Sequence, residues 1–223
     1  MKNTRNIIIT IILGIITASY VYFVRIYDVA IIGPNDTKVG FSKINGWFRD
    51  LVGTNMKVYK VSKYAGYAVL LIAAIYGLIG LIQFIKRKSI LKIDREIISL
   101  GILYALVLMV YMGFEKFIIN YRPVLIDEKL EASFPSSHTM LAFTICISSM
   151  LVCGKYIKGK LKYLAYFATM LLLTLVVLGR TLSGVHWLSD IVGGVIISSF
   201  VLMIFYTIYT YKSNLETVKK ANK

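Results

Sequence analysis

Six long apolar stretches that contain no Asp, Glu, Lys or Arg limit what this chain of 223 residues can fold into. They cover residues 6–24, 64–85, 97–114, 132–154, 163–179 and 191–211. Each is close to the roughly 20 residues with which an α-helix crosses the hydrocarbon core of a bilayer. The stretches lack the strict alternation of lipid-facing strands in a β-barrel. The pattern therefore predicts an all-α integral membrane protein, a bundle of six transmembrane helices.

The expected spans are about 6–24, 64–85, 97–114, 138–154, 163–179 and 187–211, in a single membrane domain covering residues 1–223. One domain is the economical interpretation because the chain has no internal repeat, no low-complexity tract and no Gly/Ser-rich linker. The first stretch follows Lys2 and Arg5, as the apolar region of a signal peptide would, but it lacks an A-x-A-like cleavage site before Tyr27. We interpret it as a span.

The distribution of basic residues predicts the orientation of the protein. Alternate connections and the two termini together hold 15 basic and three acidic residues, whereas the opposite side holds 11 basic and 8 acidic ones. The side richer in Lys and Arg is normally cytoplasmic. The protein is therefore expected in the cell membrane with both termini on the cytoplasmic side. This asymmetry also accounts for most of the net charge of +15, which we therefore do not interpret as a nucleic-acid footprint.

The external connections are then residues 25–63, 115–137 and 180–190, and the chemically unusual residues gather in or beside them. In the first connection, apolar side chains recur with helical spacing over about residues 43–53, at Ile44, Trp47, Phe48, Leu51 and Val52. This stripe predicts an external amphipathic helix. Two placements stay open for it: it lies in the membrane interface, or it packs on the outer surface of the bundle.

The third connection, GRTLSGVHWLSD at residues 179–190, carries Arg180, His186 and Asp190. If a helix starts near His186, the carboxylate four residues later shares its face and can hold the imidazole in one tautomer. In the second connection, Ser136 and Ser137 stand just before His138 and the fourth apolar stretch. Hydroxyls at such a position can cap a helix, and the N-terminus of a helix favours an anion. One pocket at the outer surface is expected to gather these groups.

Two histidines and an aspartate are also familiar metal ligands, so a metal site is the competing interpretation. Arg122 and Arg180 argue against it, because guanidinium groups repel a metal cation and match phosphate oxygens. The set of residues predicts a phosphoryl-transfer site with no metal and no other cofactor.

These residues resemble the type 2 phosphatidic acid phosphatases, the PAP2 family, which shares three motifs with vanadium haloperoxidases and bacterial acid phosphatases. The third motif, Ser-Arg, five residues, His, three residues, Asp, is matched by Arg180, His186 and Asp190, with Gly179 in place of the serine. The second motif, Pro-Ser-Gly-His, is matched at residues 135–138 with Ser137 in place of the glycine. The first, Lys, six residues, Arg-Pro, is matched at residues 122–123, but Glu115 holds the register of its lysine and Lys116 is one residue late.

The resemblance implies roles for the matching residues. His186 is the nucleophile that forms a phosphohistidine, Asp190 stabilises its cation, and His138 is the general acid and then the base. Arg122, Arg180, Ser136, Ser137 and Lys116 are the expected phosphate-binding residues. One residue on a helix turns a side chain by about 100°, so either Lys116 or Glu115 faces the phosphate.

The expected function is a membrane lipid phosphatase that acts at the outer face on a lipid phosphate or diphosphate, such as undecaprenyl diphosphate, phosphatidylglycerol phosphate or phosphatidic acid. A lipid phosphotransferase would use the same phosphohistidine with a different acceptor. A transporter is the alternative from another class, but its charges should lie near mid-membrane rather than at one face. The sequence does not determine the oligomeric state.

Overall fold

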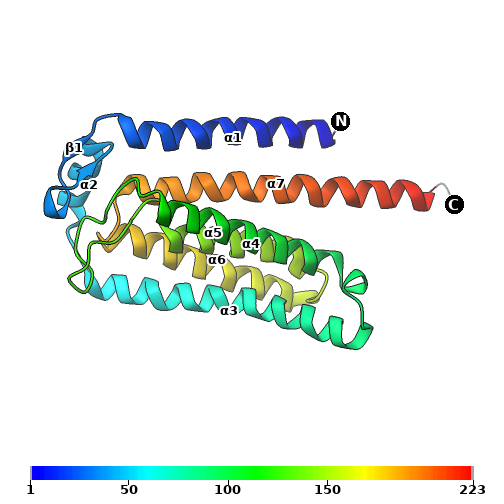
Figure 1. The fold of residues 1–223 in the computed structure, drawn as a ribbon. Helices are drawn as coiled ribbons and strands as arrows, with labels where there is room; N and C mark the ends of the chain where they lie inside the picture. The colour runs from blue at the N-terminus through cyan, green and yellow to red at the C-terminus, as the bar shows by residue number, and fades with distance from the viewer. Residues whose placement is uncertain (1, 222–223) are drawn as a thin grey trace.

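The computed structural model describes residues 2–221, with side chains described for residues 3–210. Within that range the chain forms seven α-helices (Figure 1). They are α1 (Lys2–Ile26), α2 (Ser42–Val52), α3 (Met56–Arg87), α4 (Arg95–Lys116), α5 (Ser137–Cys153), α6 (Gly159–Leu182) and α7 (Leu188–Ala221). Between α1 and α2, two-residue strands β1 (Ala30–Ile31) and β2 (Lys38–Val39) pair antiparallel, with Ala30 opposite Val39. The predicted all-α class is confirmed.

Five helices of the described chain, α1, α3, α4, α6 and α7, are long and apolar enough to cross a membrane. The sixth expected span corresponds to α5, which is apolar but only 17 residues long. The protein is therefore an integral membrane helical bundle with five long apolar helices, and a sixth span on α5 stays a prediction.

Helix α3 begins eight residues before the predicted span, at Met56. The lysines in this part of the sequence end the charge-free stretch but not the helix, because Lys is a good helix former. Asn55 caps the helix start: its side-chain oxygen accepts hydrogen bonds from the backbone N–H groups of Lys57 and Val58, both at 3.1 Å. The additional turns place Tyr59 and its neighbours beside α6.

Helix α5 forms the centre of the bundle, where it packs against α3, α4, α6 and α7. Ten of its 17 residues are buried. Helix α1 is the opposite case, because it packs along α7 and only 6% of its apolar window is buried inside the protein. Such an exposed apolar helix is stable where lipid covers it.

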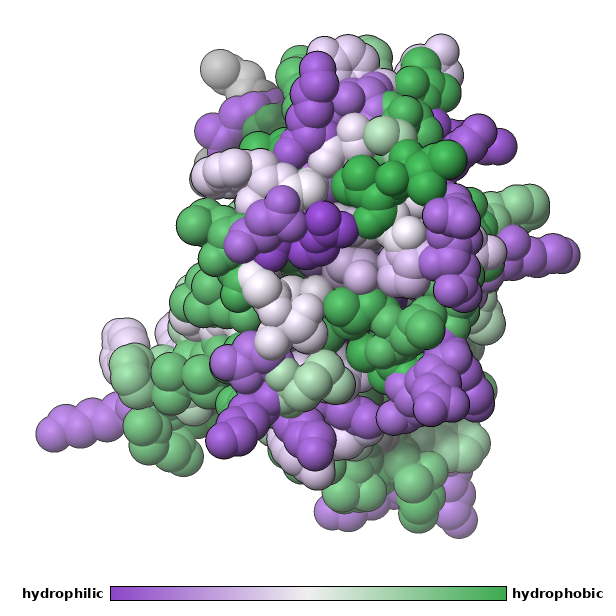
Figure 2. All heavy atoms as spheres, turned by 90° about the vertical axis from the view of Figure 1, so that its left-hand side faces the viewer, coloured by the Kyte–Doolittle hydropathy of each residue, from purple (hydrophilic) through white to green (hydrophobic). Residues whose placement is uncertain are grey.

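The connections separate into two ends of the bundle (Figure 1). Both termini and the basic connections after α3 and after α5 lie at one end. The small sheet, α2 and the connections before α5 and α7 lie at the other end, which faces the viewer in Figure 2 and mixes hydrophilic with hydrophobic residues. The residues of the three motifs therefore lie at the end opposite the basic connections.

A polar cluster around Asp94 holds the end with the basic connections together. Its carboxylate accepts hydrogen bonds from Arg87 at 2.8 Å, Gln83 at 3.0 Å and Tyr156 at 3.1 Å, and it pairs with Lys155 at 3.2 Å. Partial burial opposes ionisation, but these partners outweigh it and lower the pKa of Asp94 to about 2. The cluster joins α3, the start of α4 and the connection that follows α5.

Helix α2 packs on the start of α7 through a buried polar residue. Asn45 donates to the Ser189 hydroxyl at 2.9 Å and accepts from the Ser189 backbone N–H at 3.0 Å. The predicted apolar stripe points elsewhere, with Ile44, Trp47 and Leu51 exposed. The helix thus packs on the bundle surface and keeps an apolar face free, and the placement of that face in the membrane interface stays a prediction.

Candidate active site

His186 stands in the short connection between α6 and α7, held between Arg122 and Asp190. Arg122 Nη1 lies 3.0 Å from His186 Nε2. Since a guanidinium can only donate, Nε2 carries the lone pair and the proton is on Nδ1. Nδ1 faces Oδ2 of Asp190 at 3.6 Å, longer than a hydrogen bond, as is common for catalytic pairs without substrate.

The position of the Asp190 carboxylate is fixed from both sides. Its Oδ2 accepts the backbone N–H of Trp187 at 2.9 Å, and its Oδ1 accepts from the Asn120 side chain at 3.4 Å. Asp190 is fully buried and Asn120 nearly so. The carboxylate therefore keeps one orientation toward the imidazole.

Burial and charge together keep the His186 imidazole neutral. The ring is buried, which disfavours its charged form, and the positive charge of Arg122 and then of Arg180 disfavours it further. The pKa of His186 is therefore well below its usual value. A neutral imidazole with a lone pair on Nε2 is the form that can act as a nucleophile.

The turn that presents His186 requires a glycine. Gly184 has φ of +65°, and a Cβ at this position would stand 1.8 Å from the carbonyl oxygen of Gly53. Trp187 closes the other side of the turn: it is 1% exposed and its indole N–H donates to the Tyr121 carbonyl at 2.6 Å. The first and second connections therefore both pack on the turn that carries His186.

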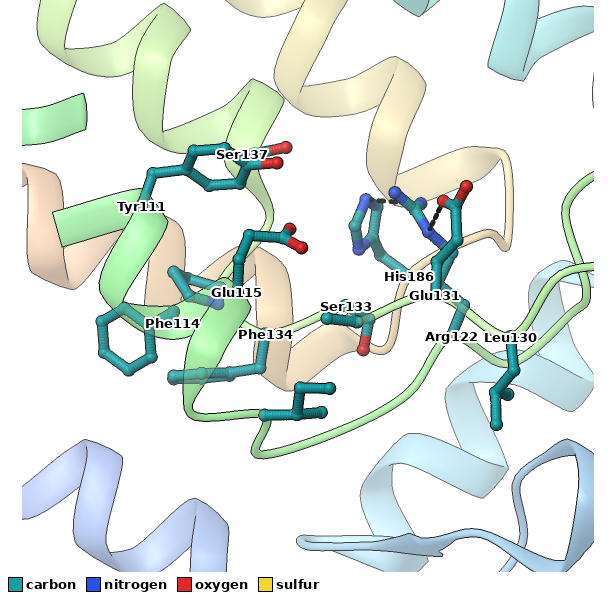
Figure 3. A pocket seen from close by; sticks show the side chains of 13 residues that line it. Tyr111, Phe114, Glu115, Arg122, Leu130, Glu131, Ser133, Phe134, Ser137 and His186 are labelled. Carbon is teal, nitrogen blue, oxygen red and sulfur yellow. Dashed lines mark hydrogen bonds and ion pairs between the residues drawn. The ribbon is translucent and has the colours of Figure 1, made fainter. Parts of the chain in front are cut away.

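A cavity of about 420 Å³ opens in front of His186 (Figure 3). Arg122 and Glu131 line it on the His186 side, where Arg122 Nε pairs with Glu131 Oε2 at 3.0 Å. Tyr111, Glu115 and Ser137 line the opposite side. The cavity therefore combines an arginine with two carboxylates.

The structure decides which residue at the end of α4 faces this cavity. Both Glu115 and Lys116 are exposed, but only Glu115 is among the residues that line the cavity. Tyr111 and Glu115 are one turn apart on α4, so both point the same way, and the next residue is rotated by about 100°. Lys116 does not line this cavity, and its contact with a phosphate stays a prediction.

The Ser-Ser-His segment divides between two places. Ser137 lines the cavity, but Ser136 is fully buried and its hydroxyl lies 3.0 Å from that of Thr139. Ser136 occupies the cap position of α5 without a side-chain cap bond, and its backbone N–H donates to the Asp190 carbonyl at 3.0 Å. The predicted hydroxyl cap is therefore wrong, because Ser136 joins α5 to α7 instead.

His138 lines a neighbouring cavity of about 210 Å³ between α3, α4 and α5. Tyr111 and Ser137 line both cavities, so the two are adjacent. His138 is also close enough to His186 to influence it electrostatically. Its ring packs against Gly66 of α3, where a Cβ would stand 2.8 Å from the ring.

Arg180 is buried beside the site and lines neither of these two cavities. Its residue is fully buried, and its three guanidinium nitrogens have no hydrogen-bond partner within the described part of the chain. The guanidinium stacks on Tyr59 of α3, 4.7 Å from the ring centroid. A buried cation without an acceptor is costly, so an anionic ligand is its natural partner.

Gly179, which stands at the serine of the third motif, is explained by helix packing. A Cβ at this position would stand 2.6 Å from the Cβ of Ser62 on α3. Ser62 is fully buried and its hydroxyl donates to the Tyr59 carbonyl at 2.8 Å. The side chain of Ser62 therefore fills the space into which a serine at 179 would extend.

This contact predicts that Gly179→Ser lowers the stability by about 1–3 kcal/mol, as overpacking does. The double variant Gly179→Ser with Ser62→Gly should recover most of that loss, because it removes the clashing atom. Thermal unfolding in detergent measures both, with Gly101→Ser as control, since nothing lies within 4 Å of a Cβ there. A single Gly179→Ser variant as stable as the wild type would contradict the packing argument.

Sequence reasoning did not find several residues that shape the site: Tyr59, Ser62, Tyr111, Asn120, Glu131 and Ser133. They come from α3, from α4 and from the connection before α5, and they meet the motif residues only through folding. Of these residues, only Asn120 could have been suspected from the sequence, because it stands two residues before Arg122 of the first motif. Over the described residues there is no group of three or more His, Cys, Asp or Glu side chains that could hold a metal ion.

Comparison with known proteins identifies the family. The PAP2 superfamily matches residues 100–214, which is more than half of the chain. A solved structure, described as the first transmembrane PAP2 type phosphatidylglycerolphosphate phosphatase from Bacillus subtilis, is similar at 18% identity with a TM-score of 0.49. That similarity covers 76% of this chain and 94% of the other. No curated protein matches this chain. The chain therefore belongs to the PAP2 superfamily.

Proposed function

We propose that this protein removes a phosphate or diphosphate headgroup from a membrane lipid at the outer face, through a phosphohistidine on His186. The observation that carries the proposal is the His186 imidazole, whose Nε2 accepts a hydrogen bond from Arg122 and whose Nδ1 faces Asp190. The buried and unpaired Arg180 supports it, because a phosphate would supply the missing acceptor.

In the first step, Nε2 of neutral His186 attacks phosphorus and the bond from phosphorus to the lipid oxygen breaks. His138 gives a proton to the leaving oxygen, and Asp190 stabilises the imidazolium. Arg122 exchanges its bond to Nε2 for one to a phosphate oxygen. Arg122, Arg180 and the hydroxyl of Ser137 neutralise the charge that builds on the transferring group.

In the second step, water attacks the phosphohistidine and the bond between nitrogen and phosphorus breaks. His138, now neutral, takes a proton from the water. Free phosphate and neutral His186 result, so the cycle closes without a metal or another cofactor. A phosphotransferase would replace the water by a lipid acceptor, and release of free phosphate without an acceptor distinguishes the two.

The proposed topology has six spans, with α5 as the short sixth, and both termini in the cytoplasm. The basic connections after α3 and α5 support this orientation. The site then lies at the level of the outer headgroups. Undecaprenyl diphosphate, phosphatidylglycerol phosphate and phosphatidic acid are the proposed substrates.

Release of inorganic phosphate from these three lipids by the purified protein, compared by kcat/KM, tests the function. Vanadate should inhibit the reaction, since it mimics the transferring phosphoryl group, and EDTA should not affect it. The absence of phosphate release from every lipid would refute the proposed hydrolysis. Strict dependence on an added divalent ion would refute the proposed mechanism.

Glu115 predicts a preference among these lipids. Its carboxylate faces the cavity together with that of Glu131, so a second phosphate beside them is repelled. Glu115→Lys should therefore raise kcat/KM for the diphosphate relative to the monophosphates by about tenfold, the effect of about 1.4 kcal/mol. The neighbouring exposed residue gives the matched control: Lys116→Glu should leave the ratio unchanged. An equal effect of Glu115→Lys on all three lipids would contradict this role.

A further inference from the structure

A second, largely apolar groove adjoins the candidate active site. It lies between α1 and the end of α4 and has a volume of about 590 Å³. Its walls come from two parts of the chain and include Ala18, Val21 and Arg25 of α1 together with Phe114, Phe117 and Ile118. Because α1 packs along α7, the groove opens sideways toward lipid, and Phe117 is 72% exposed on its edge.

The groove is adjacent to the active-site cavity. Phe114 and Ile118 line both the groove and the cavity in front of His186. A hydrocarbon chain that leaves the cavity past these two side chains would meet the apolar groove and α1.

The charge of the groove fits a lipid phosphate. Arg25, in the last turn of α1, is its one charged lining residue among the described residues. It stands at the end of the bundle that carries the site, whereas Ala18 lies two turns deeper along α1. A cation at headgroup level above an apolar channel is complementary to an anionic lipid with a long chain.

We propose that the groove between α1 and the end of α4 binds the hydrocarbon chain of the lipid phosphate substrate. This inference rests on the proposed function of the neighbouring site. It makes α1 a part of the substrate-binding surface, although α1 carries none of the family motifs.

The test fills the groove and compares chain lengths. Ala18→Trp places a bulky side chain in the groove, whereas Ile16→Trp places one on the opposite, 45% exposed face of α1. Phosphatidic acids with hexadecanoyl and with hexanoyl chains are compared in mixed micelles. Ala18→Trp should raise KM for the long-chain lipid about tenfold and leave kcat and the short-chain KM nearly unchanged. Ile16→Trp should leave kcat and both KM values nearly unchanged. An equal fold-change of KM for both chain lengths in Ala18→Trp, or the same loss in both variants, would overturn the proposal.

A second measurement needs no turnover. A phosphatidic acid with a photoreactive diazirine in mid-chain is bound to the wild-type protein, and the labelled peptides are identified by mass spectrometry. Vanadate-sensitive labelling should concentrate on residues 18–25 and 114–119. Labelling spread evenly around the bundle, or concentrated on α3, would overturn the proposal. If the wild-type protein releases no phosphate but labels these residues, the proposed function fails and the groove assignment stands.

Discussion

Replacement of His186 by alanine should abolish turnover, with kcat reduced by about 10⁴-fold or more, as for other catalytic nucleophiles. Alanine at this position has no atom that can form the bond to phosphorus. Phosphate release from the three lipids measures the loss. Acid quenching of the wild-type enzyme with ³²P-labelled substrate should also trap an acid-labile phosphoenzyme that the variant lacks.

The second histidine supplies a matched control. His138→Ala should lose about 10²- to 10⁴-fold with lipid substrates, the usual contribution of a general acid. With an aryl phosphate, whose leaving group needs no proton, His138→Ala should still form the phosphoenzyme, whereas His186→Ala should not. Retained turnover in His186→Ala, or rescue of both variants by the aryl phosphate, would contradict the assigned roles.

Replacement of Arg180 by methionine should decrease activity and increase stability. The side chain is fully buried, and among the described residues its nitrogens have no hydrogen-bond partner, while its guanidinium stacks on the ring of Tyr59. A buried unpaired charge costs several kcal/mol, and stacking on an aromatic ring returns about 2 kcal/mol of this. The variant should therefore unfold about 3 °C or more above the wild type, since 1 kcal/mol shifts Tm by roughly that amount at this size.

The activity of Arg180→Met should fall although its stability rises. Loss of one cation that stabilises the transferring phosphoryl group costs about 10²- to 10³-fold in kcat/KM. Vanadate should raise the Tm of the wild type and leave that of Arg180→Met unchanged. Arg5→Met, at an exposed position of α1 far from the site, is the control and should change neither quantity. A large fall in Tm together with unchanged kcat/KM would indicate that Arg180 is a structural residue instead.

Most of the helices could be predicted from the sequence, because uncharged stretches of about 20 residues have few stable alternatives in a bilayer. The same rule predicts spans and not helix ends, so it gave no indication that α3 begins at Met56, because charged side chains interrupt hydropathy without breaking a helix. Tyr59 and Ser62, the two residues that meet Arg180 and Gly179 across the contact between α3 and α6, lie in this additional part of the helix.

In the candidate active site, too, the sequence predicts some contacts and the tertiary structure decides others. His186 and Asp190 are four residues apart, so their proximity follows from local geometry, and the sequence alone determined that pair. Asn120, Glu131 and the choice of Glu115 over Lys116 were decided only by the tertiary structure. Their positions depend on how the end of α4 and the connection before α5 fold over the start of α7. The contacts that fix this path join distant residues, such as Arg122 and His186, 64 positions apart, and Asn120 and Asp190, 70 positions apart. Short spacings are encoded in the sequence itself, whereas contacts between distant segments exist only after the helices have packed.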